Sequence, residues 1–80
     1  MEIVCGCVVK AGAGRDKGGY FVVLEFDGEY AMICDGKRRA LEKPKRKKYK
    51  HLSATNTVLE SCEMRTNREI RKALSRFNDA

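Results

Sequence analysis

The sequence predicts a mostly β fold, a small antiparallel barrel at about residues 2–62 followed by one helix at about 67–78. Three observations support this prediction. Short runs rich in Val, Ile, Phe and Tyr alternate with glycine-containing turns. The dipeptides Asp27-Gly28 and Asp35-Gly36 are typical of two-residue hairpins. Near the C-terminus, apolar residues recur at helical spacing. With 80 residues, the chain is predicted to form a single domain spanning 1–80.

The first predicted strand covers residues 2–10. Alternate residues from Ile3 to Val9 form one face, and Val4, Gly6 and Val8 form the other, so we expect both faces to be partly covered. Gly6 within this run predicts a bend or a close backbone approach. A loop at 11–19 follows, and its glycines are expected to take the positive φ that a tight turn requires.

A meander of three strands is predicted next. Residues 20–26 form a strand that ends at the Asp27-Gly28 turn, and residues 29–34 return beside it. The Asp35-Gly36 turn then leads into a strand at 37–42. Pro44 lacks a backbone N–H, so we expect it only at a strand end or edge.

The run 45–50, with the sequence K-R-K-K-Y-K, is predicted to be a loop that is mobile without its partner, because its like charges repel one another. Tyr49 has two open interpretations: it stacks on a base or a ribose, or it packs inward at the start of the next strand. We expect residues 48–52 to extend and close the sheet through Leu52. A further short strand is predicted at 57–61.

The helix is predicted to begin after Thr66. Thr66 and Glu69 have the spacing of a capping box, in which Thr66 is the N-cap. One apolar stripe follows, formed by Ile70, Ala73, Leu74 and Phe77. A helix of this length is marginal alone, so it docks either on the barrel or on a partner.

The charge of the chain is concentrated in one segment. The net charge is +6 and the pI is near 9.4. Residues 37–50 contain nine Lys or Arg and one Glu, a net +8, so the remainder of the chain sums to −2. This distribution favours a positive patch that binds nucleic acid. The alternative is a solvated Lys-rich loop that maintains solubility.

The four cysteines, Cys5, Cys7, Cys34 and Cys62, are interpreted as reduced and metal-free. The Cys5-x-Cys7 spacing is tighter than that of usual zinc ligands, and the other two cysteines stand alone. Most of them lie in apolar contexts, where a thiol acts as a small hydrophobe. Zinc binding, disulfides and redox chemistry are the less favoured alternatives.

The stretch from Gly6 to Leu24 has three notable parts. It begins with Gly6-x-Val8-Val9, continues through the turn Ala13-Gly14-Arg15-Asp16-Lys17-Gly18 and ends with Phe21-Val22-Val23. This arrangement resembles the KOW motif of small RNA-binding SH3-like barrels, found in large-subunit ribosomal proteins and in transcription elongation factors. The resemblance covers about residues 3–52. It implies an SH3-like antiparallel barrel that binds rRNA or another structured RNA.

The resemblance implies that the turn contacts RNA, and the charge pattern adds the basic segment to it. We expect the charged triplet of the turn to be exposed, and Asp16 to hold the turn by accepting backbone N–H bonds. The chain is shorter than the ribosomal proteins it resembles and lacks their long basic extension, so two alternatives stay open: a permanent ribosomal component, or a transient ribosome-associated or RNA-chaperone-like factor. Ribosomal proteins are further expected partners. The predicted RNA-binding residues are Gly14, Arg15, Lys17, Gly18, Lys37, Arg38, Arg39, Lys43, Lys45, Arg46, Lys47, Lys48, Tyr49 and Lys50.

Other function classes are less favoured. An SH3-like protein-interaction module in a transcription or translation complex is the main alternative, although residues 37–50 are cationic rather than aromatic. DNA binding would use the same charges. We expect no enzymatic activity, because His51 is the only histidine and no cysteine has a base beside it in the sequence. We also expect a cytoplasmic location, no cofactor, no metal, no small-molecule substrate and no membrane partner.

Overall fold

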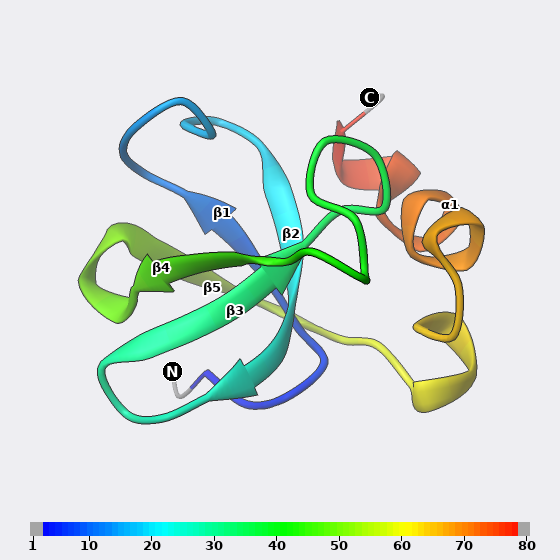
Figure 1. The fold of residues 1–80 in the computed structure, drawn as a ribbon, viewed down its shortest axis with the longest axis horizontal. Coiled ribbons are helices and arrows are strands. Elements are labelled where there is room, and N and C mark those ends of the chain that lie inside the picture. Colours follow the sequence, from blue (N-terminus) through cyan, green and yellow to red (C-terminus); the bar gives the residue numbers. More distant parts are fainter. Residues whose placement is uncertain (1–2, 79–80) are drawn as a thin grey trace.

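The computed structural model of the chain describes residues 3–78. Five antiparallel strands form one curved sheet with the order β4-β3-β2-β1-β5, and one helix packs beside it (Figure 1). The strands are β1 Cys7–Ala11, β2 Tyr20–Phe26, β3 Tyr30–Cys34, β4 Lys45–Lys48 and β5 Leu52–Val58. Two 3₁₀ turns, Tyr49–His51 and Ser61–Glu63, and the helix α1, Asn67–Asn78, complete the fold.

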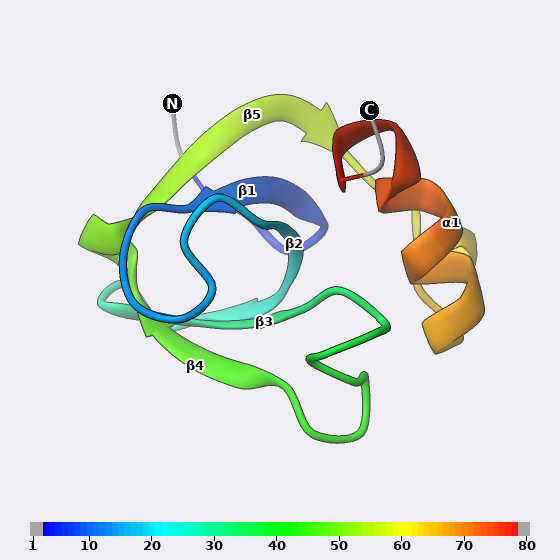
Figure 2. The same cartoon turned by 90° about the horizontal axis from the view of Figure 1, so that it is seen from above.

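The predicted class, a mostly β SH3-like antiparallel barrel with one C-terminal helix, is confirmed. Seen from above, the sheet curls so that β1 and β5 lie across from β3 and β4 (Figure 2). The hydrogen-bonded order begins at β4 and ends at β5, so within residues 3–78 strand pairing does not close the barrel.

Both faces of the sheet are buried, as the alternation of the first strand predicts. The inner face forms one apolar cluster with Val9, Phe21 and Ile33 at its centre. The outer face forms a second cluster, in which Val8 and Val22 pack against the helix. Burying both faces lets a chain of 80 residues assemble enough core to fold.

The first strand is shorter than predicted. It begins at Cys7 rather than at residue 2, which lies outside the described residues. The chain turns at Gly6, where φ is +91° and a Cβ atom would lie 2.8 Å from the carbonyl oxygen of Leu59. Gly6 donates its N–H to Val23 O, and its own carbonyl accepts from Leu59 N–H. The predicted bend at Gly6 is confirmed, and the strand begins only after it, at Cys7.

The hairpin between β2 and β3 lies where predicted but uses different turn chemistry. Gly28 has positive φ, whereas Asp27 does not. Instead, Asp27 Oδ1 accepts the N–H groups of Glu29 and Tyr30 at 3.0 and 2.7 Å. These two backbone N–H groups lower the pKa of Asp27, that of Tyr30 having the larger effect. The side chain therefore builds the turn, and the strands themselves match the prediction to within one residue.

The segment after Asp35 contradicts the prediction. Residues 37–42 form no strand, because Asp35 Oδ1 accepts the N–H groups of Lys37 and Arg39 and closes a wider loop. The strand that pairs with β3 is β4, so residues 45–48 of the run predicted as a loop at 45–50 form a strand instead, with Lys45 opposite Ile33 and Lys48 opposite Tyr30. Pro44 directly precedes this edge strand, as predicted.

The last strand also differs from the prediction. Leu52 pairs with Ala11 of β1 and joins the sheet as expected, but residues 49–51 form a 3₁₀ turn rather than an extended segment. The strand β5 then ends at Val58, so the predicted strand at 57–61 is wrong. The carbonyl contact at Gly6 redirects the chain at Leu59 toward the helix.

The helix matches its predicted bounds, Asn67–Asn78. Thr66 Oγ1 accepts the N–H of Glu69 at 3.1 Å, which is the expected capping bond. Ile70 and Leu74 are buried in the second apolar cluster, and Phe77 packs against Tyr20 with ring centroids 5.1 Å apart. Of the two predicted possibilities, the helix therefore docks on the barrel and not on a partner.

Candidate functional site

The loop at 12–19 covers the upper end of the barrel (Figure 2). It is pinned at its base, where Gly18 N–H donates to Ala11 O and Ala11 N–H donates to Gly19 O. Gly14 and Gly18 have positive φ, of 75° and 90°, whereas the other glycines of the loop do not. These two positions reverse the chain twice and place Arg15 and Lys17, both exposed, on either side of Asp16.

Asp16 is buried, which contradicts the prediction of a fully exposed charged turn. Its side chain is 3% exposed and accepts from Arg39 Nε at 3.3 Å and Arg39 Nη2 at 3.1 Å. Lys47 Nζ lies 3.9 Å from Asp16 Oδ2. Asp16 therefore holds the loop as expected, but through two cationic side chains rather than through backbone N–H groups.

Arg39 and Lys47 consequently have structural partners. Lys47 Nζ also donates to Ala13 O at 2.8 Å, and its side chain is only 10% exposed. A Cβ atom on Gly14 would lie 3.1 Å from Lys47 Nζ, so the lysine lies directly beneath the loop. The two predicted RNA-binding residues thus link the loop to β4 and to the segment 35–39. In this arrangement Lys47 is not free to meet a phosphate.

Two other cations of β4 point away from the barrel interior. Arg46 lies over the Tyr30 ring, with Cζ 3.8 Å from its centroid, and Lys48 Nζ lies 5.9 Å from the same centroid. Lys47 points toward the glycine loop whereas Arg46 and Lys48 point outward, because successive side chains of a strand lie on opposite faces. We call the exposed residues Lys45, Arg46, Lys48 and Lys50 the β4 cation row.

Tyr49 is neither fully exposed nor packed inward at the start of a strand. It belongs to the 3₁₀ turn after β4, is 40% exposed and packs against Phe26, with ring centroids 5.4 Å apart. Phe26 is itself 37% exposed. Phe26 is not among the site residues predicted from the sequence, where it belongs only to the strand at 20–26. The signal was its position at the end of β2, beyond the buried residues.

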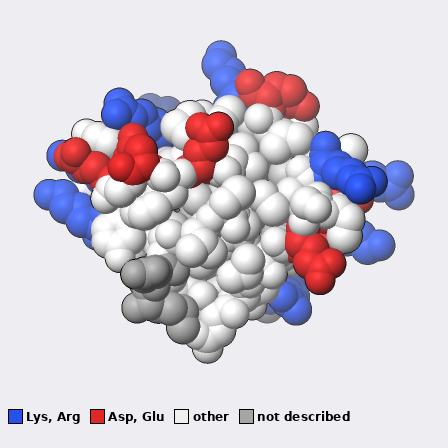
Figure 3. Space-filling view, turned by 90° about the horizontal axis from the view of Figure 1, so that it is seen from below, with Lys and Arg blue, Asp and Glu red and all other residues white. Residues whose placement is uncertain are grey.

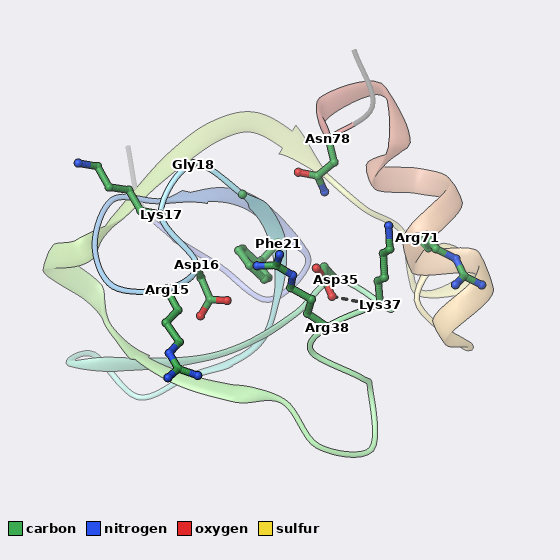
Figure 4. A pocket seen from close by; sticks show the side chains of 11 residues that line it. Arg15, Asp16, Lys17, Gly18, Phe21, Asp35, Lys37, Arg38, Arg71 and Asn78 are labelled. Carbon is green, nitrogen blue, oxygen red and sulfur yellow. Dashed lines mark hydrogen bonds between the residues drawn. The ribbon is translucent and has the colours of Figure 1, made fainter.

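The remaining predicted cations, Lys37, Arg38 and Lys43, are all exposed. Lys37 and Arg38 are exposed on the loop after β3, close to the glycine loop (Figure 4). Lys43 is exposed just before β4. By contrast, the face seen from below is largely uncharged at its centre, and acidic side chains are scattered over it (Figure 3). Lys and Arg side chains appear around the rim of this face (Figure 3).

The structure adds one charged residue that the motif did not indicate. Arg71 of α1 lines a cleft with residues of the glycine loop and of the 35–38 segment. Its position in the sequence indicated only the polar side of an amphipathic helix. The helix is fastened to the preceding loop by Asn67, whose Oδ1 accepts Leu41 N–H at 2.6 Å and whose Nδ2 donates to Glu42. This hydrogen bond from Asn67 lowers the pKa of Glu42.

The cysteines lie apart from this charged face. Cys7 and Cys34 are buried, Cys5 and Cys62 are exposed, and no disulfide joins them. Burial, reinforced by the nearby charges of Asp35 and Glu42, raises the pKa of Cys34 to about 12. Within residues 3–78, no three His, Cys, Asp or Glu side chains gather in an arrangement suited to a metal ion.

Within the part of the chain that is described, no helix has the length and apolar character needed to span a membrane.

A comparison of the sequence with protein-family models and with curated proteins finds no match.

Proposed function

We propose that this protein is a non-catalytic RNA-binding module, associated with the ribosome or with rRNA in the cytoplasm. The single observation that carries the proposal is the anchored glycine loop. Asp16 ties it to Arg39 and Lys47, while Arg15 and Lys17 remain exposed. A loop held in one conformation presents two cations at fixed positions, which suits the phosphates of a folded RNA.

The β4 cation row extends this surface. Arg46 and Lys48 are alternate residues on one face of the edge strand β4, where the regular rise spaces them at roughly 6 to 7 Å, and Lys45 and Lys50 flank them in the sequence. That spacing is close to the separation of successive phosphates in a nucleic acid strand. Contacts of this kind position RNA but do not read its sequence. Recognition therefore depends on the shape of the RNA and on its 2′-hydroxyl groups.

The exposed aromatic pair supports a stacking contribution. Phe26 and Tyr49 form a surface next to Lys48 and Lys50, which is the combination of aromatic ring and cation that binds unpaired bases. The same pair is the observation that favours the second candidate, an SH3-like protein-interaction module. Replacing Phe26 and Tyr49 by Ala separates the two: the RNA module loses the stacking contribution, about 1 to 3 kcal/mol per base, but keeps its salt-dependent binding, whereas a peptide-binding module loses its partner.

The salt dependence of binding tests the main proposal. Replacing three members of the β4 cation row by Ala should lower the slope of log affinity against log salt by about 2 to 3, since each lost phosphate contact contributes roughly 0.7 to 0.9. A matched control removes three exposed cations from the helix side of the molecule and should change the slope by less than one contact. The row variant changes Lys45, Arg46 and Lys48, and the control variant changes Arg65, Arg68 and Lys72.

The loop should act differently from the row. Arg15→Ala with Lys17→Ala removes two contacts at most, so the slope should fall by less than about 2. Because the loop is rigid, the same variant should lose much of its preference for a structured RNA over random RNA. Binding isotherms at several salt concentrations, with structured RNA and duplex DNA compared at matched salt, measure both effects. Equal slopes for the row and control variants would contradict the proposed surface.

A further inference from the structure

A cleft of about 390 Å³ opens where three segments meet at the upper end of the molecule (Figure 4). The glycine loop forms one wall with Arg15 and Lys17, the loop after β3 forms a second with Lys37 and Arg38, and α1 contributes Arg71. No single element contains this group of five cations. It exists only because the helix packs back onto the barrel.

The walls of the cleft are fixed in place. Gly36 packs against the carbonyl of Asn67 at the start of α1, where a Cβ atom would clash. At the other end of the helix, Asn78 Oδ1 accepts Tyr20 N–H and Asn78 Nδ2 donates to Tyr20 O, at 2.9 and 3.1 Å. The helix is therefore pinned at both ends, and the cleft does not have to assemble when a ligand enters.

The positive charge of the cleft is not neutralised by its own acids. Asp16 is occupied by Arg39 and Lys47, and Asp35 Oδ1 accepts two backbone N–H groups. Among residues 3–78, ion pairs form only at Asp16, so the five cations of the cleft have no carboxylate partner there. Five cations against the two carboxylates of Asp16 and Asp35 leave the lining of the cleft net positive, and an anion in the cleft relieves the repulsion between the cations.

The side chains indicate which anion fits. Lys37 and Arg38 extend toward the middle of the cleft, near Asn78 and above the edge of Phe21, whereas Arg15, Lys17 and Arg71 lie at its rim with their charged ends directed outward (Figure 4). Two cations that converge inside the cleft suit a phosphate, which carries up to two charges and accepts bonds on three oxygens, and the three cations at the rim suit the chain attached to it. The volume exceeds that of a phosphate alone and is within the range of nucleotide-sized ligands.

We propose that this cleft binds a phosphate group of RNA together with its nucleotide, so that α1 belongs to the RNA-binding surface. The inference rests on the proposed function and adds to it a defined receptor and a contribution from the helix. The phosphate has two sources with the same chemistry: the 5′-terminal monoester of an RNA, or an internal phosphodiester at a sharp bend.

Two charge-matched variants of the same helix test the inference. Arg71→Gln removes a cation that lines the cleft, whereas Arg68→Gln removes an exposed cation of α1 that does not line it. We expect Arg71→Gln to weaken binding to a structured RNA about tenfold, the value of one charge-assisted hydrogen bond, and Arg68→Gln to weaken it less than about twofold. Urea unfolding of both variants checks that neither change disturbs the fold.

Two further arms identify the source and keep the inference separate from the proposed function. The RNA is used with a 5′-phosphate and with a 5′-hydroxyl: an Arg71→Gln effect confined to the former identifies the terminal monoester, and an equal effect identifies the internal phosphodiester. Adenosine monophosphate is titrated against the protein while the amide signals of Gly18 and Gly19 are followed by NMR. Shifts in the native protein that Arg71→Gln abolishes support the cleft.

Equal losses of RNA affinity in the two variants would overturn the inference and leave the proposed function intact. A native protein that binds no RNA overturns the proposed function, and the cleft then stands as a nucleotide site only if adenosine monophosphate still shifts these signals. Absence of both effects overturns both proposals.

Discussion

Replacing Asp16 tests whether this residue anchors the glycine loop to the barrel. Its carboxylate is buried under the glycine loop and holds Arg39 from one side and Lys47 from the other. Asp16→Ala leaves both cations without their counter-charge. We therefore expect a loss of stability well beyond that of an ordinary surface substitution, together with a loosened loop.

The magnitude follows from the exposure of the partners. Breaking a fully buried pair by removing one partner costs about 3 to 5 kcal/mol. The Arg39 side chain is 29% exposed and can turn toward water, and Lys47 keeps its bond to Ala13 O. We therefore expect a smaller loss in the free energy of unfolding, about 2 to 3 kcal/mol. Asp16→Asn, which keeps the volume but not the charge, should lose somewhat less.

Urea unfolding measures this loss. For a chain of this size the urea slope is about 1 kcal/mol per molar, so the midpoint should fall by about 2 to 3 M with the slope unchanged. A double-mutant cycle with Arg39→Ala should give a coupling of at least about 1 kcal/mol. Glu29→Gln, at an exposed acid of the β2–β3 turn, is the matched control and should change stability by less than about 0.5 kcal/mol.

RNA binding provides a second readout with an opposite electrostatic expectation. Asp16→Asn raises the net charge by one, which by charge alone should tighten binding to any RNA. If the anchored loop presents Arg15 and Lys17 at fixed positions, the same variant should instead lose preference for a structured RNA over random RNA. A stability change within about 0.5 kcal/mol of the control, the limit for surface sites, would refute the role of Asp16 as the anchor.

Three further predictions concern other parts of the fold. Gly36→Ala should destabilise the protein by about 2 to 4 kcal/mol in urea unfolding, because φ is +76° and the new Cβ meets the carbonyl at the start of α1. Gly28→Ala, also at positive φ but with open space around it, should cost only about 1 to 2 kcal/mol, and equal costs would argue against the helix contact. The hydrogen bond from Asn67 lowers the pKa of Glu42. The ionised Glu42 carboxylate therefore contributes fully to the free energy of unfolding above the ordinary pKa of Glu, and this contribution is lost as the pH falls through the lowered pKa. Glu42→Gln should therefore flatten the pH dependence of the unfolding midpoint below about pH 5, and an unchanged profile would contradict this. The Cys34 thiol, with its pKa raised to about 12, should resist iodoacetamide in the folded protein at about pH 8 while the exposed thiols react, as peptide mass spectrometry can show; modification of Cys34 before unfolding would count against its burial.

Three parts of the structure could be predicted from the sequence because the signals for them lie within their own residues. The helix at Asn67–Asn78 has its own cap and a continuous apolar stripe, and both signals lie within its sequence. The strand Tyr20–Phe26 combines high β propensity with a turn residue directly after it. The bend at Gly6 could also be predicted, because a glycine weakens a strand and is typical of places where the backbone bends or approaches another segment closely.

The β4 strand could not be predicted because its own residues do not favour a strand. Lys has low β propensity, and a run of like charges is typical of a solvated loop. The segment is extended because β3 offers it an unpaired edge, and charged side chains are well tolerated on an edge strand. The Asp35-Gly36 turn misled the prediction for a related reason: the Asp35 carboxylate caps a longer loop that packs on the helix.

The sequence alone determined the class of the fold, the position of its helix and the presence of a cationic face, since these follow from periodicity, capping and net charge. Only the tertiary structure decided which cations remain available to a ligand. Asp16 finds Arg39 and Lys47 through contacts between segments distant in the chain, and Arg71 joins the cleft through the docking of α1. The energy of a charge depends on its burial and on its nearest counter-charges, and both are properties of the folded chain.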